Sequence, residues 1–484
     1  MKEEVFRLER VTQIVDGITL LDNFSMHIFK GEIMGLVCIN AHGKEALINL
    51  LCQNIPIHYG HIYFQEKLVN NYEHSSMSMN PVAVIEKQSW LVEDLTVADN
   101  IFVLRKGFKK CIINPRTLNA QFRRFTEEIE IDIDPGEPVS DLSFFEKCVV
   151  ELLKAVVAGA KLIIFRDMSN FISAAELKKI HALMRHYSKR GLSFLYICNH
   201  HEEAFEICDR ISIMENGKVL KVLSKKDFRC EMIAPYTLDF SRIESIPARK
   251  TSMDGILKFE NVVTEKIKDM SFTVEKGECV VFLDINNTAL SDMIKLMMGE
   301  IRPVSGNILL DGQPFAGKDS GLKNEVCIIQ ENPIQSMLFG EMSYIDNLCF
   351  LLDKKQPHLW MNKNVKRSVM QEYEPLIGED IYASDISDLS LFSLYNLVYY
   401  RIHLYHPDAV FCVQPFSGAD MYLRRHIVEL INQLRKKRIT VIILAVNIAD
   451  SLVVADRLMV IEQGRLRKEY RSEEFHFFRE SHYR

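Results

Sequence analysis

Short apolar runs recur along the chain, and the stretches between them place apolar residues on one helical face. Short apolar runs bounded by turn residues predict buried strands, and the amphipathic stretches predict helices. Strands that alternate with helices indicate an α/β fold with a mainly parallel sheet covered on both faces. The clearest runs are 161–165 (KLIIF), 192–198 (LSFLYIC), 408–413 (DAVFCV) and 440–446 (TVIILAV).

The two halves of the chain repeat each other. The segment CDRISIMENGKVL near 208–220 matches ADRLMVIEQGRLR near 455–467, and the aspartate offset is 456 − 209 = 247. Two further landmarks give the same offset, which indicates duplication of a whole domain. The pairs at this offset are Asp209 with Asp456, Ser143 with Ser390, and Asn100 with Asn347.

A chain of 484 residues is long enough for two domains, in agreement with the repeat. We expect a first domain over 1–235 and a second over 256–484. The joint at 236–255 is polar, contains proline and is weakly periodic, so we expect it to be a linker.

The composition restricts the function. The net charge of −6 argues against bulk attraction to nucleic acid or to an anionic membrane. The 11 cysteines show no metal-ligand spacing and indicate reduced cytosolic thiols. The N-terminus shows no signal peptide, and the apolar runs are far shorter than the roughly 20 residues that span a bilayer. Any membrane role is therefore expected to come through a partner.

Candidate chemistry is concentrated in residues 31–47, GEIMGLVCINAHGKEAL. Gly43 and Lys44 stand where a phosphate-binding loop ends, after an apolar strand and before an apolar helix. The hydroxyl residue that normally follows this lysine and holds magnesium is replaced by Glu45. The sequence alone also allows Gly43 and Lys44 to be only a turn between a strand and a helix.

The landmarks, in their order, resemble the ATP-binding cassette family. Within it they are most similar to the tandem-cassette ATPases of monosaccharide importers of the ribose and galactose class. Three segments carry the resemblance, namely 141–167 (a signature helix and the next strand), 199–219 (a switch-histidine segment) and 259–278 (a short second-cassette opening). It implies two P-loop NTPase-type cassettes, each a mainly parallel sheet flanked by helices with an antiparallel and a helical subdomain.

The resemblance implies an ATP site in the first cassette. The family loop GxNGAGKST is matched here by CINAHGKEA, in which Asn40, Gly43 and Lys44 are kept as candidate cofactor-binding residues. The first glycine is Cys38, and the middle one is Ala41, whose β-carbon would tighten the cradle for the phosphates.

The family's acidic motif DE-P-T is matched by the four residues that start at Arg166. Asp167 stands in for the glutamate that polarises water, and His200 matches the switch histidine; both are candidate catalytic residues. Arg166 replaces the magnesium aspartate. We therefore predict an ion pair between Glu45 and Arg166 in place of the metal, with no magnesium bound.

The second cassette departs further from the family pattern. Its loop has Asp284 for the first glycine and Leu290 for the lysine, and Gln414 stands at the acidic motif. Val446 lies near the switch-histidine position. In the family each nucleotide also meets the other cassette's signature serine, so the resemblance makes Ser390 a further candidate for binding the first site's nucleotide.

Several functions stay open at this point. The first is a cytosolic subunit, peripheral at the inner membrane face, that docks on a permease as a scaffold or nucleotide sensor with hydrolysis lost or very weak. The second is a working sugar-importer ATPase with unconventional sites. The third is a regulatory module that binds another cassette protein or a regulator. A soluble tandem-cassette translation factor is disfavoured, because the chain is acidic and its joint is short, and we expect no nucleic-acid partner.

Overall fold

The computed structural model describes ten stretches of the chain. These are residues 3–103, 114–127, 129, 131–168, 172–199, 201–236, 255–315, 326–355, 363–448 and 451–477. The chain divides into two compact units, Met1–Leu238 with Asp420–Tyr422 and Asp239–Ala419 with Leu423–Arg484. Most of the expected linker at 236–255 lies outside the described residues, so the domain boundaries stay predictions.

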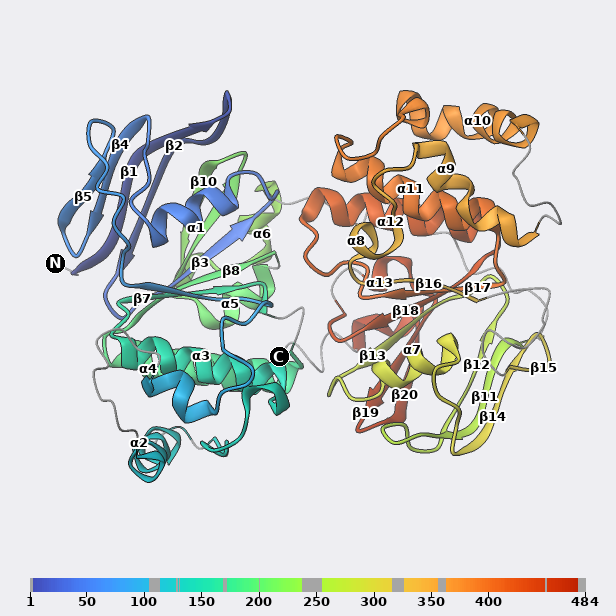
Figure 1. Ribbon diagram of the computed structural model, residues 1–484, viewed down its shortest axis with the longest axis horizontal. Coiled ribbons are helices and arrows are strands. Elements are labelled where there is room, and N and C mark those ends of the chain that lie inside the picture. Colours follow the sequence, from blue (N-terminus) through green and yellow to red (C-terminus); the bar gives the residue numbers. More distant parts are fainter. Residues whose placement is uncertain are drawn as a thin grey trace. The chain divides into compact units, whose positions relative to one another are not determined.

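The first unit contains two sheets (Figure 1). A four-stranded antiparallel sheet has the order β2-β1-β4-β5, with strands Glu4–Val15 (β1), Ile18–Phe29 (β2), Tyr59–Phe64 (β4) and Lys67–Asn71 (β5). A six-stranded sheet has the order β10-β9-β3-β8-β7-β6, with strands Ile33–Cys38 (β3), Val82–Ile85 (β6), Leu162–Arg166 (β7), Ser193–Cys198 (β8), Arg210–Glu215 (β9) and Lys218–Ser224 (β10). Its strands run parallel except β10, which closes an antiparallel hairpin with β9.

Helices cover both faces of the six-stranded sheet in the first unit. One hydrophobic core joins α1 and the small sheet to one face, and a second core joins α3 and α4 to the other face (Figure 1). The helices are Lys44–Cys52 (α1), Pro115–Glu127 (α2), Phe144–Ala158 (α3), Ala174–Lys189 (α4), His201–Ile207 (α5) and Cys230–Ile233 (α6), with a π-helical turn at Asp99–Val103.

The second unit repeats this plan. Its small sheet has the order β12-β11-β14-β15, with strands Gly255–Val263 (β11), Met270–Glu275 (β12), Ser305–Leu310 (β14) and Gln313–Pro314 (β15). Its larger sheet has the order β16-β17-β18-β13-β19-β20, with strands Cys279–Asp284 (β13), Val326–Ile329 (β16), Ala409–Val413 (β17), Thr440–Ala445 (β18), Arg457–Glu462 (β19) and Arg465–Arg471 (β20).

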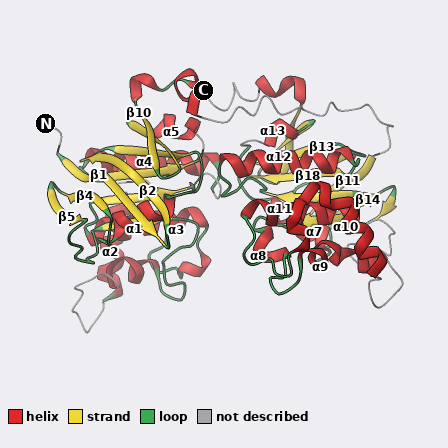
Figure 2. Ribbon diagram, turned by 90° about the horizontal axis from the view of Figure 1, so that it is seen from above, coloured by secondary structure: helices red, strands yellow, loops and turns green. Residues whose placement is uncertain are grey.

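The helices of the second unit are Leu290–Met298 (α7), Pro333–Met337 (α8), Tyr344–Cys349 (α9), Lys363–Ile377 (α10), Leu391–Tyr405 (α11), Met421–Lys436 (α12) and Ser451–Val454 (α13) (Figure 2). One hydrophobic core joins α7 and the small sheet to one face of the larger sheet, and another joins α11 and α12 to the other face, whereas α10 packs against α9. The strand order of the larger sheet is the same in both units when corresponding strands are compared. The predicted fold, two α/β cassettes with mainly parallel sheets, is therefore confirmed.

The central strands are buried along their whole length, which favours apolar residues at nearly every position. β3 (IMGLVC) and β8 (SFLYIC) are buried on both faces, which accounts for continuous apolar runs in place of alternation. Ligands of such sheets bind at the carboxyl ends of the strands. The carboxyl ends of β3, β6 and β7 carry the residues of the candidate site.

Candidate functional site

The loop between β3 and α1 presents Lys44 at the start of a helix. Gly43 has φ +79, and a β-carbon there would lie 2.3 Å from the Leu20 carbonyl oxygen, so only glycine fits. Asn40 fixes the loop to the β9–β10 turn, because its Nδ2 donates to Asn216 Oδ1 at 2.6 Å and its Oδ1 accepts from the Asn216 amide at 3.0 Å. The Ala41 amide also donates to Asp420 Oδ2 at 2.9 Å, and His42 Nε2 lies 2.8 Å from the Thr19 carbonyl oxygen, so several contacts hold the loop in shape.

Strand register brings an arginine beside a second glutamate. β6 and β7 are parallel neighbours, and Ile85 pairs with Phe165. The residues that follow them, Glu86 and Arg166, are therefore adjacent at the carboxyl ends of the two strands. Arg166 Nη1 donates to Glu86 Oε2 at 3.1 Å.

The same guanidinium meets the loop helix. Arg166 Nη1 lies 3.1 Å from Glu45 Oε2, and Arg166 Nη2 donates to Glu45 Oε1, so the pair is bidentate. Arg166 Nε is 3.8 Å from Asp167 Oδ2. The Arg166 side chain is 24% exposed, Glu86 is 27% exposed and Glu45 is 60% exposed. The structure thus brings together the two residues of the predicted ion pair and adds Glu86 to them.

Behind this cluster lies a buried ion pair. Lys44 Nζ donates to Asp167 Oδ2 at 3.0 Å, and the two side chains are only 8% and 11% exposed. Burial lowers the pKa of Lys44, but the charge of Asp167 and its hydrogen bond raise it, and the net shift is upward. Lys44 is therefore fully charged at neutral pH. The other carboxylate oxygen, Asp167 Oδ1, is buried without a hydrogen-bond partner in the described structure.

The remaining predicted site residues lie elsewhere or outside the described structure. His200 is outside the described residues. Ser390 lies in the second unit, where it caps α11; its Oγ accepts from the Ser393 amide at 3.2 Å. A role of Ser390 in holding a nucleotide stays a prediction. Glu86 was not predicted from the sequence: it directly follows an apolar strand, but its contact with Arg166 depends on the register of β6 and β7.

The second unit carries no equivalent of the charged cluster at the matching positions. Leu290 replaces the lysine and is buried at 4% exposure in the core beneath the small sheet. Gln414 follows β17, and its amide donates to the Leu444 carbonyl oxygen at 2.8 Å. Phe416 and Val446 are buried. These positions therefore contribute to packing and to the sheet.

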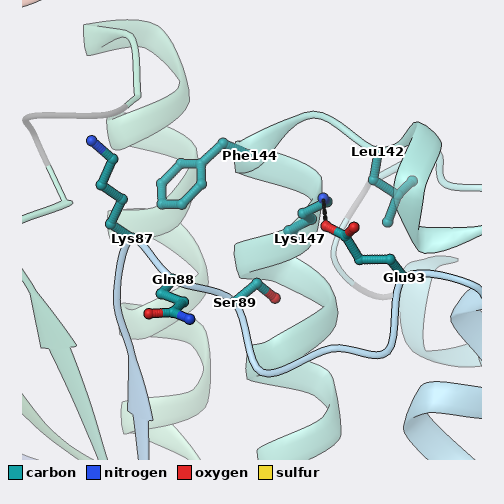
Figure 3. Close-up of a pocket in the computed structure, with 7 residues that line it drawn as sticks. All are labelled: Lys87, Gln88, Ser89, Glu93, Leu142, Phe144 and Lys147. Atoms are coloured by element: carbon teal, nitrogen blue, oxygen red, sulfur yellow. Dashed lines mark hydrogen bonds and ion pairs between the residues drawn. The ribbon is translucent and has the colours of Figure 1, made fainter. Parts of the chain in front are cut away.

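A pocket of about 480 Å³ lies in the first unit between the loop after β6 and the start of α3 (Figure 3). Lys87, Gln88 and Ser89 face Phe144 and Lys147 across it. The lining residues are Lys87, Gln88, Ser89, Glu93, Leu142, Phe144 and Lys147.

A buried carboxylate fixes the loop that forms one wall of this pocket. Glu151 Oε1 accepts from Ser89 Oγ at 2.9 Å and from the Trp90 amide at 2.7 Å. Trp90 itself is 70% exposed. The loop thus presents a large aromatic side chain to solvent from a rigid support.

Known proteins resemble the chain along almost its whole length. Residues 21–168 match the family model described as ABC transporter. The ribose import ATP-binding protein of Clostridium perfringens (strain 13 / Type A) is 24% identical over 480 residues, covering 97% of this chain and 96% of that protein. The putative ribose/galactose/methyl galactoside import ATP-binding protein of Halalkalibacterium halodurans is 26% identical over 486 residues, covering 97% of this chain and 92% of that protein. These matches support the ATP-binding cassette family and an ATP-binding first unit.

Solved structures share the fold over nearly the whole chain. The structure titled RNase-L Inhibitor has a TM-score of 0.62 at 15% identity, covering 98% of this chain and 93% of that chain. A model of ribosome-bound archaeal Pelota and ABCE1 has a TM-score of 0.66 at 14% identity, covering 98% of this chain and 80% of that chain. The likeness therefore concerns the fold alone.

Proposed function

We propose that this chain is the cassette subunit of a sugar-importer-type assembly that docks on a membrane permease and has given up magnesium-dependent hydrolysis. Its first unit acts as a scaffold or a nucleotide sensor. The observation that carries this proposal is the Arg166 guanidinium, which is bonded to both Glu45 and Glu86. The names of the relatives, which are ribose and galactose import ATP-binding proteins, support the importer part.

The charge arrangement is a poor fit to magnesium. Magnesium requires oxygen ligands in near-octahedral geometry. Here the oxygens of Glu45 are bonded to Arg166, and Glu86 is bonded to the same side chain. A second cation would have to displace the guanidinium and would be repelled by it at short range. Glu45 and Arg166 therefore substitute for the metal, and no catalytic step is assigned to magnesium.

The cluster also sets the conditions for phosphate binding. Two cationic side chains, Lys44 and Arg166, face the carboxylates of Glu45, Glu86 and Asp167, which gives a formal charge of 2 − 3 = −1. An incoming phosphate must therefore take over one of these cations from a carboxylate. Arg166 is the better candidate, because guanidinium groups bind phosphate through two parallel hydrogen bonds and Arg166 is partly exposed.

One observation favours residual hydrolysis as a second candidate function. Asp167 Oδ1 is buried and accepts no hydrogen bond in the described structure. Such an oxygen can accept a hydrogen bond from a water molecule. A water oriented in this way would be the nucleophile in hydrolysis. Lys44 Nζ donates to the other oxygen, so the carboxylate is held in place.

A reversion experiment tests the loss of magnesium chemistry. Glu45→Ser with Arg166→Asp restores the oxygen ligands of the family pattern at both positions. We expect steady-state hydrolysis of MgATP to be at background in the wild-type chain and to rise in the double variant. Lys44→Ala is the control, because it removes phosphate binding in either background. Wild-type turnover that depends on both magnesium and Lys44 would overturn the proposal and establish the working ATPase.

Docking is tested separately. The structure contains no helix, among its described residues, with the length and hydropathy to cross a membrane. Membrane association is therefore proposed to run through the permease, at the inner face, with the wall of the pocket near Trp90 as the contact. We expect the full chain to co-purify with co-expressed permease subunits and Trp90→Ala to weaken recovery. An exposed aromatic away from the pocket, Tyr59, provides the matched control as Tyr59→Ala. Recovery of a soluble regulator without permease would favour the regulatory module.

A further inference from the structure

The second unit contains an aspartate wrapped by the start of a helix. Asp284 ends β13 and is fully buried at 0% exposure. Its Oδ2 accepts from the amide of Ala289 at 2.6 Å and from the amide of Leu290 at 3.3 Å, both at the start of α7. The first amides of a helix have no partner within the helix, so the carboxylate satisfies groups that otherwise need an external acceptor.

Such a turn is an anion-binding element. Backbone amides and the helix dipole there favour negative charge, as they do for the phosphates of a nucleotide. Burial raises the pKa of Asp284, and the amides of Ala289, Leu290, Thr288 and Asn286 lower it. The surrounding amides thus offset part of the cost of burying the charge.

The first unit provides an internal comparison, because the two loops are anchored alike. Asn40 Oδ1 accepts from the Asn216 amide at 3.0 Å. At the equivalent position Asn286 Oδ1 accepts from the Gln463 amide at 3.0 Å. Both loops are therefore tied to the hairpin that follows the central strands, and differences between them come from other positions.

The loops differ in which charges they contain. Where the second loop has Asp284, the first has Cys38, a buried thiol whose pKa burial raises to about 12. Cys38 is neutral and a weak acceptor, so it places no anion of its own in the first loop. The Ala41 amide of that loop donates instead to Asp420 Oδ2 at 2.9 Å. Where the first loop has Lys44, the second has the buried Leu290. The second loop therefore contains an anion of its own and has lost the cation that would attract another.

We propose that the Asp284 carboxylate takes the place of a nucleotide phosphate in the second unit. The Asp284 side chain fills the loop, so the loop keeps the conformation of a phosphate-bound loop without requiring a ligand. The second unit therefore has a structural role and does not bind a nucleotide in this loop. The chain then has at most one nucleotide site, in the first unit.

The full-length chain and its Asp284→Gly variant test this, with inorganic phosphate as the probe and hydrogen exchange of the peptide over 284–298 as the readout. In the wild type we expect strong protection that phosphate does not change. In Asp284→Gly we expect protection to fall by about tenfold or more and to return with phosphate. A folded Asp284→Gly variant that phosphate leaves unprotected overturns the proposal.

A control and a variant-free arm complete the test. Asp292 is a second buried carboxylate on α7, and its Oδ2 accepts from Thr264 Oγ1 at 2.6 Å and from the Lys266 amide at 3.2 Å. Asp292→Asn should weaken protection without any phosphate effect. If Asp284→Gly does not fold, the wild type decides, because added protection of its 284–298 peptide by phosphate overturns the proposal and no change supports it. A phosphate-dependent change in hydrogen exchange at residues 40–46 tests only the function proposed for the first unit.

Discussion

Arg166 holds Glu45 through a bidentate ion pair, with Nη1 3.1 Å from Oε2 and Nη2 bonded to Oε1. Arg166 ends β7 and Glu45 lies in α1, and the two residues are 121 positions apart in the chain. Each replaces a residue type that holds magnesium in the family the chain resembles. We propose that this fixed cation, which is also bonded to Glu86, replaces a metal cation.

Removal of Arg166 should destabilise the first unit more than removal of Glu45. Arg166→Ala leaves Glu86 and Glu45 close together without a cation, and we expect a loss of about 1–2 kcal/mol. Glu45 is 60% exposed, so Glu45→Ala should cost only about 0–0.5 kcal/mol. Urea unfolding of the full chain measures both losses. Equal losses for the two variants would contradict the role assigned to Glu86.

Lys44 and Asp167 should prove strongly coupled. Each is about nine-tenths buried, so Lys44→Ala leaves an unpaired buried carboxylate and should cost about 3 kcal/mol. The double variant Lys44→Ala with Asp167→Ala removes both charges and should cost clearly less than the sum of the single variants. A double-mutant cycle by chemical unfolding measures this coupling. Additive losses would show that the two side chains do not interact in solution.

Acid should destabilise the first unit through His181. Burial and the nearby Arg185 lower the pKa of His181 to about 4 from a usual value near 6.5. The folded state therefore holds this histidine neutral, and its contribution is complete above pH 6.5 and is lost as the pH falls toward 4. The loss is of order 3 kcal/mol over that window.

Unfolding at pH 7.5, 6, 5 and 4.5 checks this dependence. His181→Gln should flatten the stability profile of the first unit over that range. His403 should give the same sign in the second unit, because burial lowers its pKa to about 4 as well. The His403→Gln variant therefore serves as the matched control, since it should change only the second unit. A wild-type profile that His181→Gln leaves unchanged would contradict the assignment.

The sequence predicts the fold well, because its signals are local or repeated. Buried strands such as β8 appear as apolar runs, and a constant offset reveals the duplication. The pairing of Glu45 with Arg166 could be predicted because Arg166 ends β7 and Glu45 comes just after the loop that follows β3. The carboxyl ends of β3 and β7 lie at the same edge of the sheet.

Other parts of the site depend on details that a single sequence does not contain. Glu86 meets Arg166 because Ile85 pairs with Phe165, and register between distant strands leaves no local signal. Lys44 reaches Asp167 only through its side-chain conformation. Asp284 looks like the loss of a glycine until the structure shows which amides its carboxylate accepts from.

The central claim is that Arg166 takes the place of magnesium in the first unit. Calorimetric titration of the wild-type chain with ATP, in magnesium and again in EDTA, tests it most directly. The account predicts the same affinity and heat in both buffers, because the guanidinium supplies the local positive charge. Binding that tightens tenfold or more when magnesium is present would contradict it.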